Sequence, residues 1–364
     1  MKRNCLKCSL VVHFLLICLF AAAQNKFSTV DTWLNNNLKA IGGRAVLVLY
    51  KDGKIIYSKS ANEMTRRQKM MGKFVARKKG VDADEALQDF GMDTRQRIAS
   101  CSKWLSAALV MTFVDEGKMQ LEDTIGMYLP VMSEQGKGNI TIWQCLSHLT
   151  AIKSPSLKES LTEMGQLADM DAAVQQIAAM PMEGEPGKVF HYSNVGLQLA
   201  AAVIEKISGK DFETLFQDRI AGPCGMVNSD FGHGNVPLAA GGAWSTPNDY
   251  IRFLAMILND GLYNGKQVLS AKAVAAMQHN YAANTTVASS PAEAGKWGYG
   301  FGEWVMDDAK ERSQAVSSPG LFGSFPWVDN KLGYAGFLFT MNINNKGRHE
   351  RYSELKKLVD AALQ

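Results

Sequence analysis

Residues 45–57 read AVLVLYKDGKIIY. Two runs rich in β-branched, aromatic and other apolar residues flank an Asp-Gly pair, which is the pattern of a β-hairpin. Strand character returns near the other end of the chain, at residues 299–305, 320–328 and 334–341. Strands at both ends predict an antiparallel sheet whose neighbouring strands come from distant parts of the sequence.

Helical periodicity dominates the chain between these strands. Together the patterns predict a mixed α+β fold: an antiparallel sheet flanked by helices, with an all-helical lobe inserted at about residues 115–240. Residues 24–364 are interpreted as a single domain. Helices are expected at residues 27–40, 100–116, 142–148, 171–180, 195–207, 212–220, 248–259, 271–278 and 352–363.

The first 23 residues have the pattern of a secretory signal peptide. Three basic residues precede an apolar run at residues 10–20, and small residues follow it up to Ala23. Cleavage near Ala23 would release an exported protein, either periplasmic or extracellular. Lipid attachment at Cys18 is disfavoured because the preceding Ile17 is bulky where a small residue is expected. No later run is long and apolar enough to span a bilayer.

Charge and cysteine content exclude several classes of protein. The chain has 39 basic and 35 acidic residues, and three of the basic ones precede residue 24, so the remainder is nearly neutral and gives no basis for a nucleic-acid partner. The exception is residues 66–79, with seven Lys or Arg and no acid. This segment is either a solvated helix or loop, or a surface that meets an anionic polymer or lipid.

Three cysteines remain after residue 23, namely Cys101, Cys145 and Cys224. Their spacing fits neither a metal site nor a disulfide framework, so they are expected to act as small buried apolar residues. Whether any of them pair is left open. The six histidines form no close metal-binding pair. We therefore predict neither a metal nor a cofactor.

The first chemical motif is Ser100-Cys101-Ser102-Lys103. At a helix start, residues three apart share a face, so the Lys103 amine can reach the Ser100 hydroxyl. Lys103 is the only charged residue between Arg97 and Asp115, and burial would lower its pKa towards the range where a neutral amine acts as a base. Such a base can activate a serine nucleophile. The alternative is a helix-capping serine followed by an ordinary surface lysine.

The second motif is His191-Tyr192-Ser193-Asn194, which directly precedes a predicted helix. A loop in this position can aim Tyr192 and Asn194 into a cleft, where a tyrosine near a lysine can transfer protons. The alternative is a capped helix start with a core tyrosine. His148 and His191 lie near the motifs, and each is interpreted as a structural histidine.

The third motif is Ser318-Pro319-Gly320-Leu321, at the predicted start of a strand. Gly320 would let a substrate approach the backbone closely. The N–H of Leu321, together with that of Ser100, could then form an oxyanion hole.

In order and spacing these motifs resemble those of the serine β-lactamases and penicillin-binding proteins, in particular the class C β-lactamases with their esterase and D-peptidase relatives. The resemblance runs from about residue 43 to the end of the chain. It also includes Arg97-Ile98-Ala99, Leu146-Ser147-His148, Pro186-Gly187, residues 242–249 and Tyr299-Gly300-Phe301-Gly302.

The resemblance implies a role for each site residue. Ser100 would attack a carbonyl and hold the acyl group, while Lys103 and Tyr192 would transfer protons. Asn194 would orient Lys103 and a substrate amide, and the Ser100 and Leu321 amides would bind the oxyanion.

One departure from the family pattern bears on the substrate. Ser318 occupies the position where the family usually has Lys or His, a cation that helps to hold a substrate carboxylate. A serine offers one neutral hydrogen bond and no charge. Unless Arg312 or another cation substitutes, this favours an ester or amide without an essential terminal carboxylate.

We therefore predict an exported serine hydrolase that cleaves a small-molecule or peptide-like acyl substrate, an ester or amide, through an acyl-enzyme on Ser100. The first alternative is a D-alanyl-D-alanine carboxypeptidase or β-lactamase. The second is a non-catalytic binding protein that has kept this fold.

Overall fold

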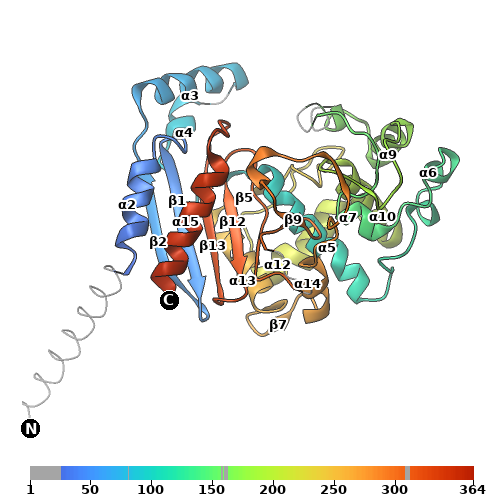
Figure 1. Cartoon of the computed structure of the whole chain (residues 1–364). Helices are drawn as coiled ribbons and strands as arrows, with labels where there is room; N and C mark the ends of the chain where they lie inside the picture. Colours follow the sequence, from blue (N-terminus) through green and yellow to red (C-terminus); the bar gives the residue numbers. More distant parts are fainter. Residues whose placement is uncertain (1–25, 81, 157–158, 160–162, 308–311) are drawn as a thin grey trace, which may run out of the picture.

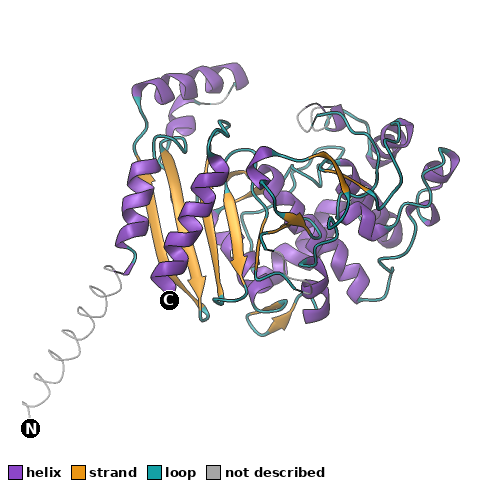
Figure 2. Cartoon of the chain, in the orientation of Figure 1, coloured by secondary structure: helices purple, strands orange, loops and turns teal. Residues whose placement is uncertain are grey.

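The computed structural model describes residues 26–80, 82–156, 159, 163–307 and 312–364. The predicted signal peptide lies outside the described residues. A seven-stranded sheet in the order β2-β1-β13-β12-β11-β10-β9 forms the centre of the fold (Figures 1 and 2). Every neighbouring pair in this sheet is antiparallel.

The predicted hairpin is formed by β1 (Arg44–Lys51) and β2 (Lys54–Asn62). Its turn residues Asp52 and Gly53 have φ of +50° and +79°, the left-handed backbone that a tight hairpin turn requires. The other edge of β1 pairs with β13 (Tyr334–Thr340), near the end of the chain. The prediction that both chain ends build one antiparallel sheet is confirmed.

The remaining sheet strands are β9 (Gly298–Tyr299), β10 (Trp304–Val305), β11 (Ala315–Ser317) and β12 (Phe325–Asp329). The strands predicted at residues 299–305 and 320–328 are wrong in extent. Residues 300–303 turn the chain between β9 and β10, and residues 318–324 form a loop between β11 and β12. Both segments look strand-like because side chains such as Phe301 are buried within a turn.

Both faces of the sheet are covered by helices. Val46 and Val48 of β1 point into a core shared with α5 (Ser102–Asp115) and α13 (Pro247–Leu258). Leu47 and Leu49 point into a second core shared with α2 (Ser28–Asn37) and α15 (Arg348–Leu363). Burial on both sides explains why β1 is a continuous apolar run rather than an alternating one.

Within the described part of residues 115–240, the regular elements are helices, as predicted, apart from one short strand, and long loops join them. This strand, β4 (Val189–His191), pairs in parallel with β8 (Thr286–Ser289). The helices here are η2 (Ile125–Met127), α6 (Pro130–Glu134), α7 (Ile142–Leu146), α9 (Met170–Ala179), α10 (Val195–Ser208), α11 (Phe212–Phe216), the π-helical turn η3 (Gln217–Ala221) and α12 (Gly222–Cys224).

Shorter elements complete the described chain. They are α3 (Arg66–Lys79), α4 (Ala83–Leu87), β3 (Gln96–Arg97), η1 (Ala99–Cys101), β5 (Trp244–Ser245), β6 (Leu262–Tyr263), β7 (Lys266–Gln267), α14 (Ala271–Met277) and η4 (Ala292–Ala294). None of the helices in the described ranges combines the length and apolar character needed to cross a bilayer.

The three cysteines are buried, and their thiols are free. Burial raises the pKa of each thiol above its ordinary value, so all three stay protonated at neutral pH. They therefore pack as small apolar residues, as the sequence indicated.

Candidate active site

Ser100 lies in the single turn η1, directly before α5, and not within the α-helix itself. The preceding Ala99 has a φ of +48°, a left-handed backbone that residues with a Cβ rarely adopt. Ser100 is partly exposed, whereas its neighbours Cys101 and Ser102 are buried. The turn therefore presents one hydroxyl to the outside and anchors the residues around it.

Three hydrogen bonds from the segment around residues 239–250 hold this turn. The backbone N–H of Ile98 donates to the Ala243 carbonyl at 3.0 Å, and the Ala243 N–H donates to Ser102 Oγ at 3.0 Å. The Tyr250 hydroxyl donates to the Cys101 carbonyl at 2.8 Å. Sequence reasoning missed Tyr250, although it directly follows the family-like residues 242–249.

Lys103 is completely buried one helical turn after Ser100, with its Nζ 3.3 Å from Ser100 Oγ. Its amine donates to the Asn194 Oδ1 at 3.3 Å and to the Ala240 carbonyl at 2.7 Å. Burial lowers the pKa of Lys103 to about 7, because the charged form loses its hydration. A surface lysine is thereby ruled out, and the amine is available as a base near neutral pH.

Asn194 is buried at the start of α10, 91 residues from Lys103 in sequence. Its side-chain carbonyl oxygen accepts a hydrogen bond from the lysine amine. The backbone carbonyl of Ala240 also accepts a hydrogen bond from the Lys103 amine. This contact was not predicted, because a backbone carbonyl has no sequence signature.

Tyr192 follows β4 and is also brought to the site. The centre of its ring lies 4.8 Å from Lys103 Nζ, and the rings of His148 and Trp304 pack against it at 4.7 and 5.1 Å. Burial raises the pKa of Tyr192 well above its ordinary value, and a hydrogen bond with Ser100 offsets only part of this. Tyr192 is therefore a protonated phenol at neutral pH.

Each of the two neighbouring histidines has one ring nitrogen close to a polar side chain, while the buried Nδ1 of His148 has no hydrogen-bond partner among the described residues. His148 Nε2 lies 3.0 Å from the Tyr299 hydroxyl, and burial lowers the pKa of His148 far enough to keep the ring neutral. His191 Nδ1 lies 2.5 Å from a Glu183 carboxylate oxygen. Across the residues that the structure describes, no cluster of His, Cys, Asp or Glu could hold a metal ion.

The third motif also contacts the Ser100 segment, but the Ser318 side chain is buried against the backbone and does not face solvent. Its hydroxyl lies 3.2 Å from the Ser100 carbonyl and 2.9 Å from the Gly302 carbonyl, and the residue is 2% exposed. A hydroxyl has a single proton, so these backbone oxygens share it. Ser318 therefore ties the end of β11 to the turn that carries Ser100.

Gly320 and Leu321 lie in the loop between β11 and β12, so the strand start predicted there is wrong. A Cβ on Gly320 would stand 2.4 Å from the Ile98 carbonyl oxygen, which explains the glycine. The N–H of Gly323, whose φ is +89°, donates back to the Gly320 carbonyl at 2.9 Å. This turn carries the Leu321 backbone past the Ser100 segment, with the Leu321 side chain exposed.

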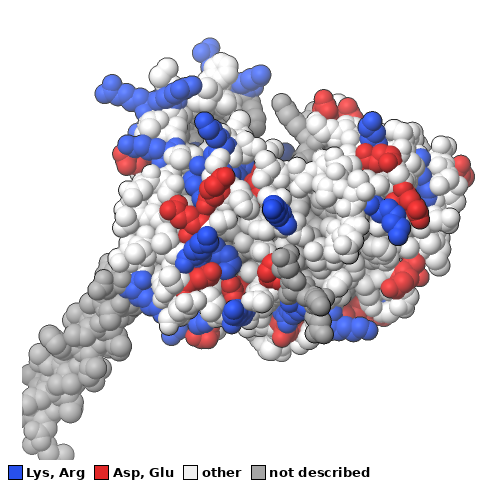
Figure 3. Space-filling model, in the orientation of Figure 1, with Lys and Arg blue, Asp and Glu red and all other residues white. Residues whose placement is uncertain are grey.

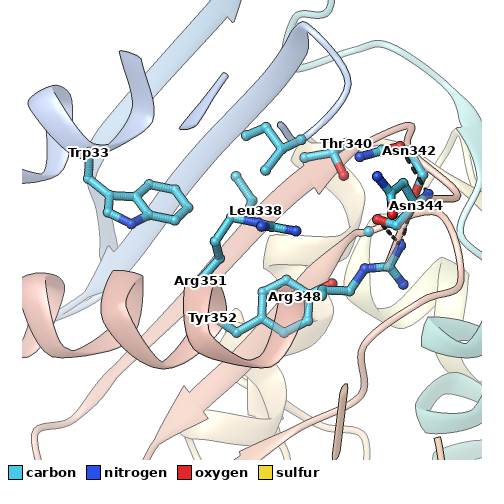
Figure 4. Close-up of a pocket in the computed structure, with 10 residues that line it drawn as sticks. Trp33, Leu338, Thr340, Asn342, Asn344, Arg348, Arg351 and Tyr352 are labelled. Carbon is cyan, nitrogen blue, oxygen red and sulfur yellow. Dashed lines mark hydrogen bonds between the residues drawn. The ribbon is translucent and has the colours of Figure 1, made fainter. Parts of the chain in front are cut away.

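Arg312 and Arg348 could replace the cation that the family usually has at position 318, but each is paired with a carboxylate. Arg312 donates to Asp260 and Gln278, each at 2.6 Å. Arg348, beside the loop at Gly323, is 2% exposed and pairs with Glu293 at 3.0 Å. Figure 4 shows its guanidinium group against the backbone of Asn342 and Asn344, which accept hydrogen bonds from it.

Sequence reasoning also missed Glu303, which is fully buried in the turn between β9 and β10. Among the described residues its carboxyl oxygens have no hydrogen-bond partner, although the Trp104 indole lies beside them. Burial raises the pKa of Glu303 well above its ordinary value, so the group is a neutral carboxylic acid. The adjacent Gly302 packs directly against the backbone of Lys103.

Comparisons with known proteins agree with this geometry. The sequence pattern of the Beta-lactamase family matches residues 34–361. Protein Rv1367c of Mycobacterium tuberculosis is 26% identical over 303 residues, which cover 68% of this chain and 74% of that protein. The D-alanyl-D-alanine-carboxypeptidase/endopeptidase AmpH of Escherichia coli is 24% identical over 203 residues, 47% of this chain and 51% of AmpH.

Among solved structures, a Bacteroides dorei protein described as a β-lactamase is 27% identical, with a TM-score of 0.74 over 92% of this chain and 97% of its own. EstCE1, a hydrolase with promiscuous acyltransferase activity, shares the fold at 17% identity, with a TM-score of 0.72 over 94% of this chain and 100% of its own. The family match spans all three motifs. The chain thus belongs to the beta-lactamase family of serine hydrolases.

Proposed function

We propose that the protein is an exported serine hydrolase that cleaves an ester or amide through an acyl-enzyme on Ser100. One observation carries the proposal: the surroundings of the Lys103 amine. A neutral amine has two protons and one lone pair. The carbonyl oxygens of Asn194 and Ala240 each accept a hydrogen bond from one N–H of this amine. The lone pair is then left for the Ser100 hydroxyl, whose oxygen lies 3.3 Å from Nζ.

The reaction then follows from the two buried proton carriers. Ser100 Oγ attacks the substrate carbonyl while its proton passes to Lys103. The protonated phenol of Tyr192 relays a proton to the leaving group as the ester or amide bond breaks. In the second half, water attacks the acyl group, its proton returns through the same pair, and Ser100 is regenerated. The backbone N–H groups of Ser100 and Leu321 are the proposed oxyanion donors.

The substrate class follows from the charges near the third motif. Ser318 is neutral and engaged with the backbone, and Arg312 and Arg348 are each paired with a carboxylate. Neither of these two arginines could bind the terminal carboxylate of a substrate without first leaving its own carboxylate partner. An ester or amide lacking that group fits better.

A D-alanyl-D-alanine carboxypeptidase or β-lactamase activity is the second candidate. The match to AmpH favours it, as does the position of Arg348 beside the loop at Gly323. Release of Arg348 from Glu293 would give a carboxylate a binding partner. A non-catalytic binding protein has less support, because burying a lysine beside a serine is costly without a use for its altered pKa.

Intact-mass spectrometry tests the proposal. The purified protein is incubated separately with a fluorophosphonate and a penicillin, alongside Ser100→Ala and the control Ser60→Ala, which removes an exposed serine on β2. An adduct with the fluorophosphonate alone, lost only in Ser100→Ala, is the expected result. Adducts with both reagents would support the peptidase or β-lactamase instead. No adduct with either would overturn the acyl-enzyme. Export is tested separately, by the N-terminal sequence of the secreted chain.

A further inference from the structure

The helix α3 stands at the edge of the molecule, next to α4 (Figure 1). Both of its ends are well formed. Thr65 and Gln68 make a reciprocal capping box at the start, and Gly80 ends the helix with a left-handed backbone whose N–H donates to the last carbonyls. The basic segment is therefore a capped α-helix and not a loop.

The helix presents its small residues to the protein and its large apolar residues to solvent. Ala76 is 3% exposed, and a Cβ on Gly72 would stand 2.8 Å from Leu87. These residues are four apart and share a face. The exposed apolar residues of α3 are Met70 at 72%, Met71 at 57%, Phe74 at 65% and Val75 at 42%. An ordinary surface helix has the opposite arrangement.

Basic side chains surround this apolar ridge. Six of them are exposed, and among the described residues none takes part in an ion pair: Arg66, Arg67, Lys69, Lys73, Arg77 and Lys78. Figure 3 shows Lys and Arg gathered over α3, without Asp or Glu on the helix itself. The face combines unpaired positive charge with exposed apolar area.

We propose that α3 docks the protein onto an anionic phospholipid surface. The helix would lie in the plane of the headgroups, with Met70 and Phe74 entering the boundary with the acyl chains and the cations contacting lipid phosphates. Binding of an anionic polymer would require only the basic side chains of α3. The exposed methionine and phenylalanine side chains favour lipid, because apolar area gains free energy only where it leaves water. This inference does not depend on the proposed hydrolase activity.

Cosedimentation with vesicles tests the docking surface. The protein used in this experiment starts at Gln24. It then includes every described element but not the apolar run at residues 10–20, which could itself bind lipid. Vesicles of phosphatidylcholine are compared with vesicles that contain one-third phosphatidylglycerol. The charge variant is Arg67→Gln/Lys73→Gln/Lys78→Gln, and the apolar variant is Met70→Gln/Phe74→Gln. The matched control removes three exposed lysines elsewhere, Lys54→Gln/Lys272→Gln/Lys331→Gln.

We expect the parent chain and the control to bind the anionic vesicles and not the neutral ones. The charge variant should bind about a hundredfold more weakly, and the apolar variant at least about tenfold more weakly. Glutamine keeps helix propensity, and circular dichroism confirms that each variant retains its helices. Failure of the parent to prefer anionic vesicles would overturn the proposal, as would an equal loss in the control. If only the charge variant lost binding, the surface would recognise polyanions rather than a membrane.

Discussion

Lys103 and Tyr192 show how burial sets opposite roles for two residues in one site. Removal of water lowers the pKa of the lysine, because its charged form is the protonated one, and raises that of the tyrosine, because its charged form is the deprotonated one. Near neutral pH the lysine can therefore accept a proton while the tyrosine can donate one. Pairs of groups with pKa values moved apart in this way identify the base and the acid.

The pH dependence of catalysis follows from Lys103. In the proposed mechanism the neutral form of Lys103 is the base, so kcat/KM for a soluble ester should rise with pH through about 7 and then level off. Lys103→Met should lose about a thousandfold in kcat while still folding, since methionine fills the same buried space. Stopped-flow or plate assays across this range measure both. A flat profile through neutral pH would show that Lys103 is not the base.

Ser318 separates two explanations of the third motif. If it is a structural tie, Ser318→Ala should lower the free energy of unfolding by about 1–2 kcal/mol, because the buried carbonyls of Ser100 and Gly302 lose their donor. In that case kcat falls with little change in KM. Urea unfolding and steady-state kinetics provide the two readings. An increase in KM with unchanged stability would instead place Ser318 in contact with substrate.

At the scale of elements, the catalytic turn is held between two segments from later in the chain. The segment at residues 239–250 binds it through backbone and hydroxyl groups, and Ser318 and Gly320 of the β11–β12 loop also contact it. The position of Ser100 thus depends on contacts made more than 130 residues away in sequence.

Gly320→Ala should disturb this packing. The new Cβ would clash with the Ile98 carbonyl oxygen, so the loop must shift, at a cost of about 1–3 kcal/mol. The Leu321 N–H would move with it, and kcat should fall. Gly91→Ala is the matched control, because a Cβ there meets open space. Equal stability and activity of the two variants, in thermal unfolding and ester hydrolysis, would contradict the close contact.

Much of this level of structure could be predicted from the sequence, because helices and hairpins depend on local pattern. The Asp52-Gly53 turn and the helix that ends before Gly117 are examples, and Gly117 has the expected left-handed φ of +67°. The β11–β12 loop could not be predicted. Residues 320–328 are mostly apolar, and most of them are buried although Leu321 is exposed. An apolar run of this kind does not distinguish a strand from a tight turn.

At the scale of the whole molecule, buried titratable groups make stability depend on pH. Folded Glu303 keeps its proton above pH 4.5, where the unfolded side chain loses it, so this group lowers the free energy of unfolding as pH rises. Lys103 acts in the opposite sense between about pH 7 and 10.5, because there the unfolded chain binds the proton that the folded chain lacks.

Glu303→Gln should remove the first of these effects. Relative to the parent, the variant should gain stability as pH rises above about 4.5, at up to about 1 kcal/mol per pH unit. Glutamine has nearly the same volume and stays neutral. Urea unfolding at several pH values measures the difference. A parallel pH dependence in both proteins would mean that Glu303 is ionised in the folded chain.

The global architecture and the motif positions could be predicted from the sequence, but the inner surroundings of the site could not. Strands at both chain ends indicated the sheet, and spacing pointed to Ser100 and Lys103. The Ala240 carbonyl and the neutral Glu303 left no pattern, because they act through backbone atoms and burial that exist only after folding. Ser318 was identified by position, but the direction of its hydroxyl depends on the loop geometry.

The free thiols of Cys101, Cys145 and Cys224 can serve as reporters of local unfolding. Each is buried and protonated, so a thiol reagent reaches it only when the surrounding structure parts. Cys101 lies in the catalytic turn, Cys145 in α7 and Cys224 in α12, three separate places in the fold. The order in which a thiol reagent labels them would therefore show which part of the molecule opens first, without any substitution in the chain.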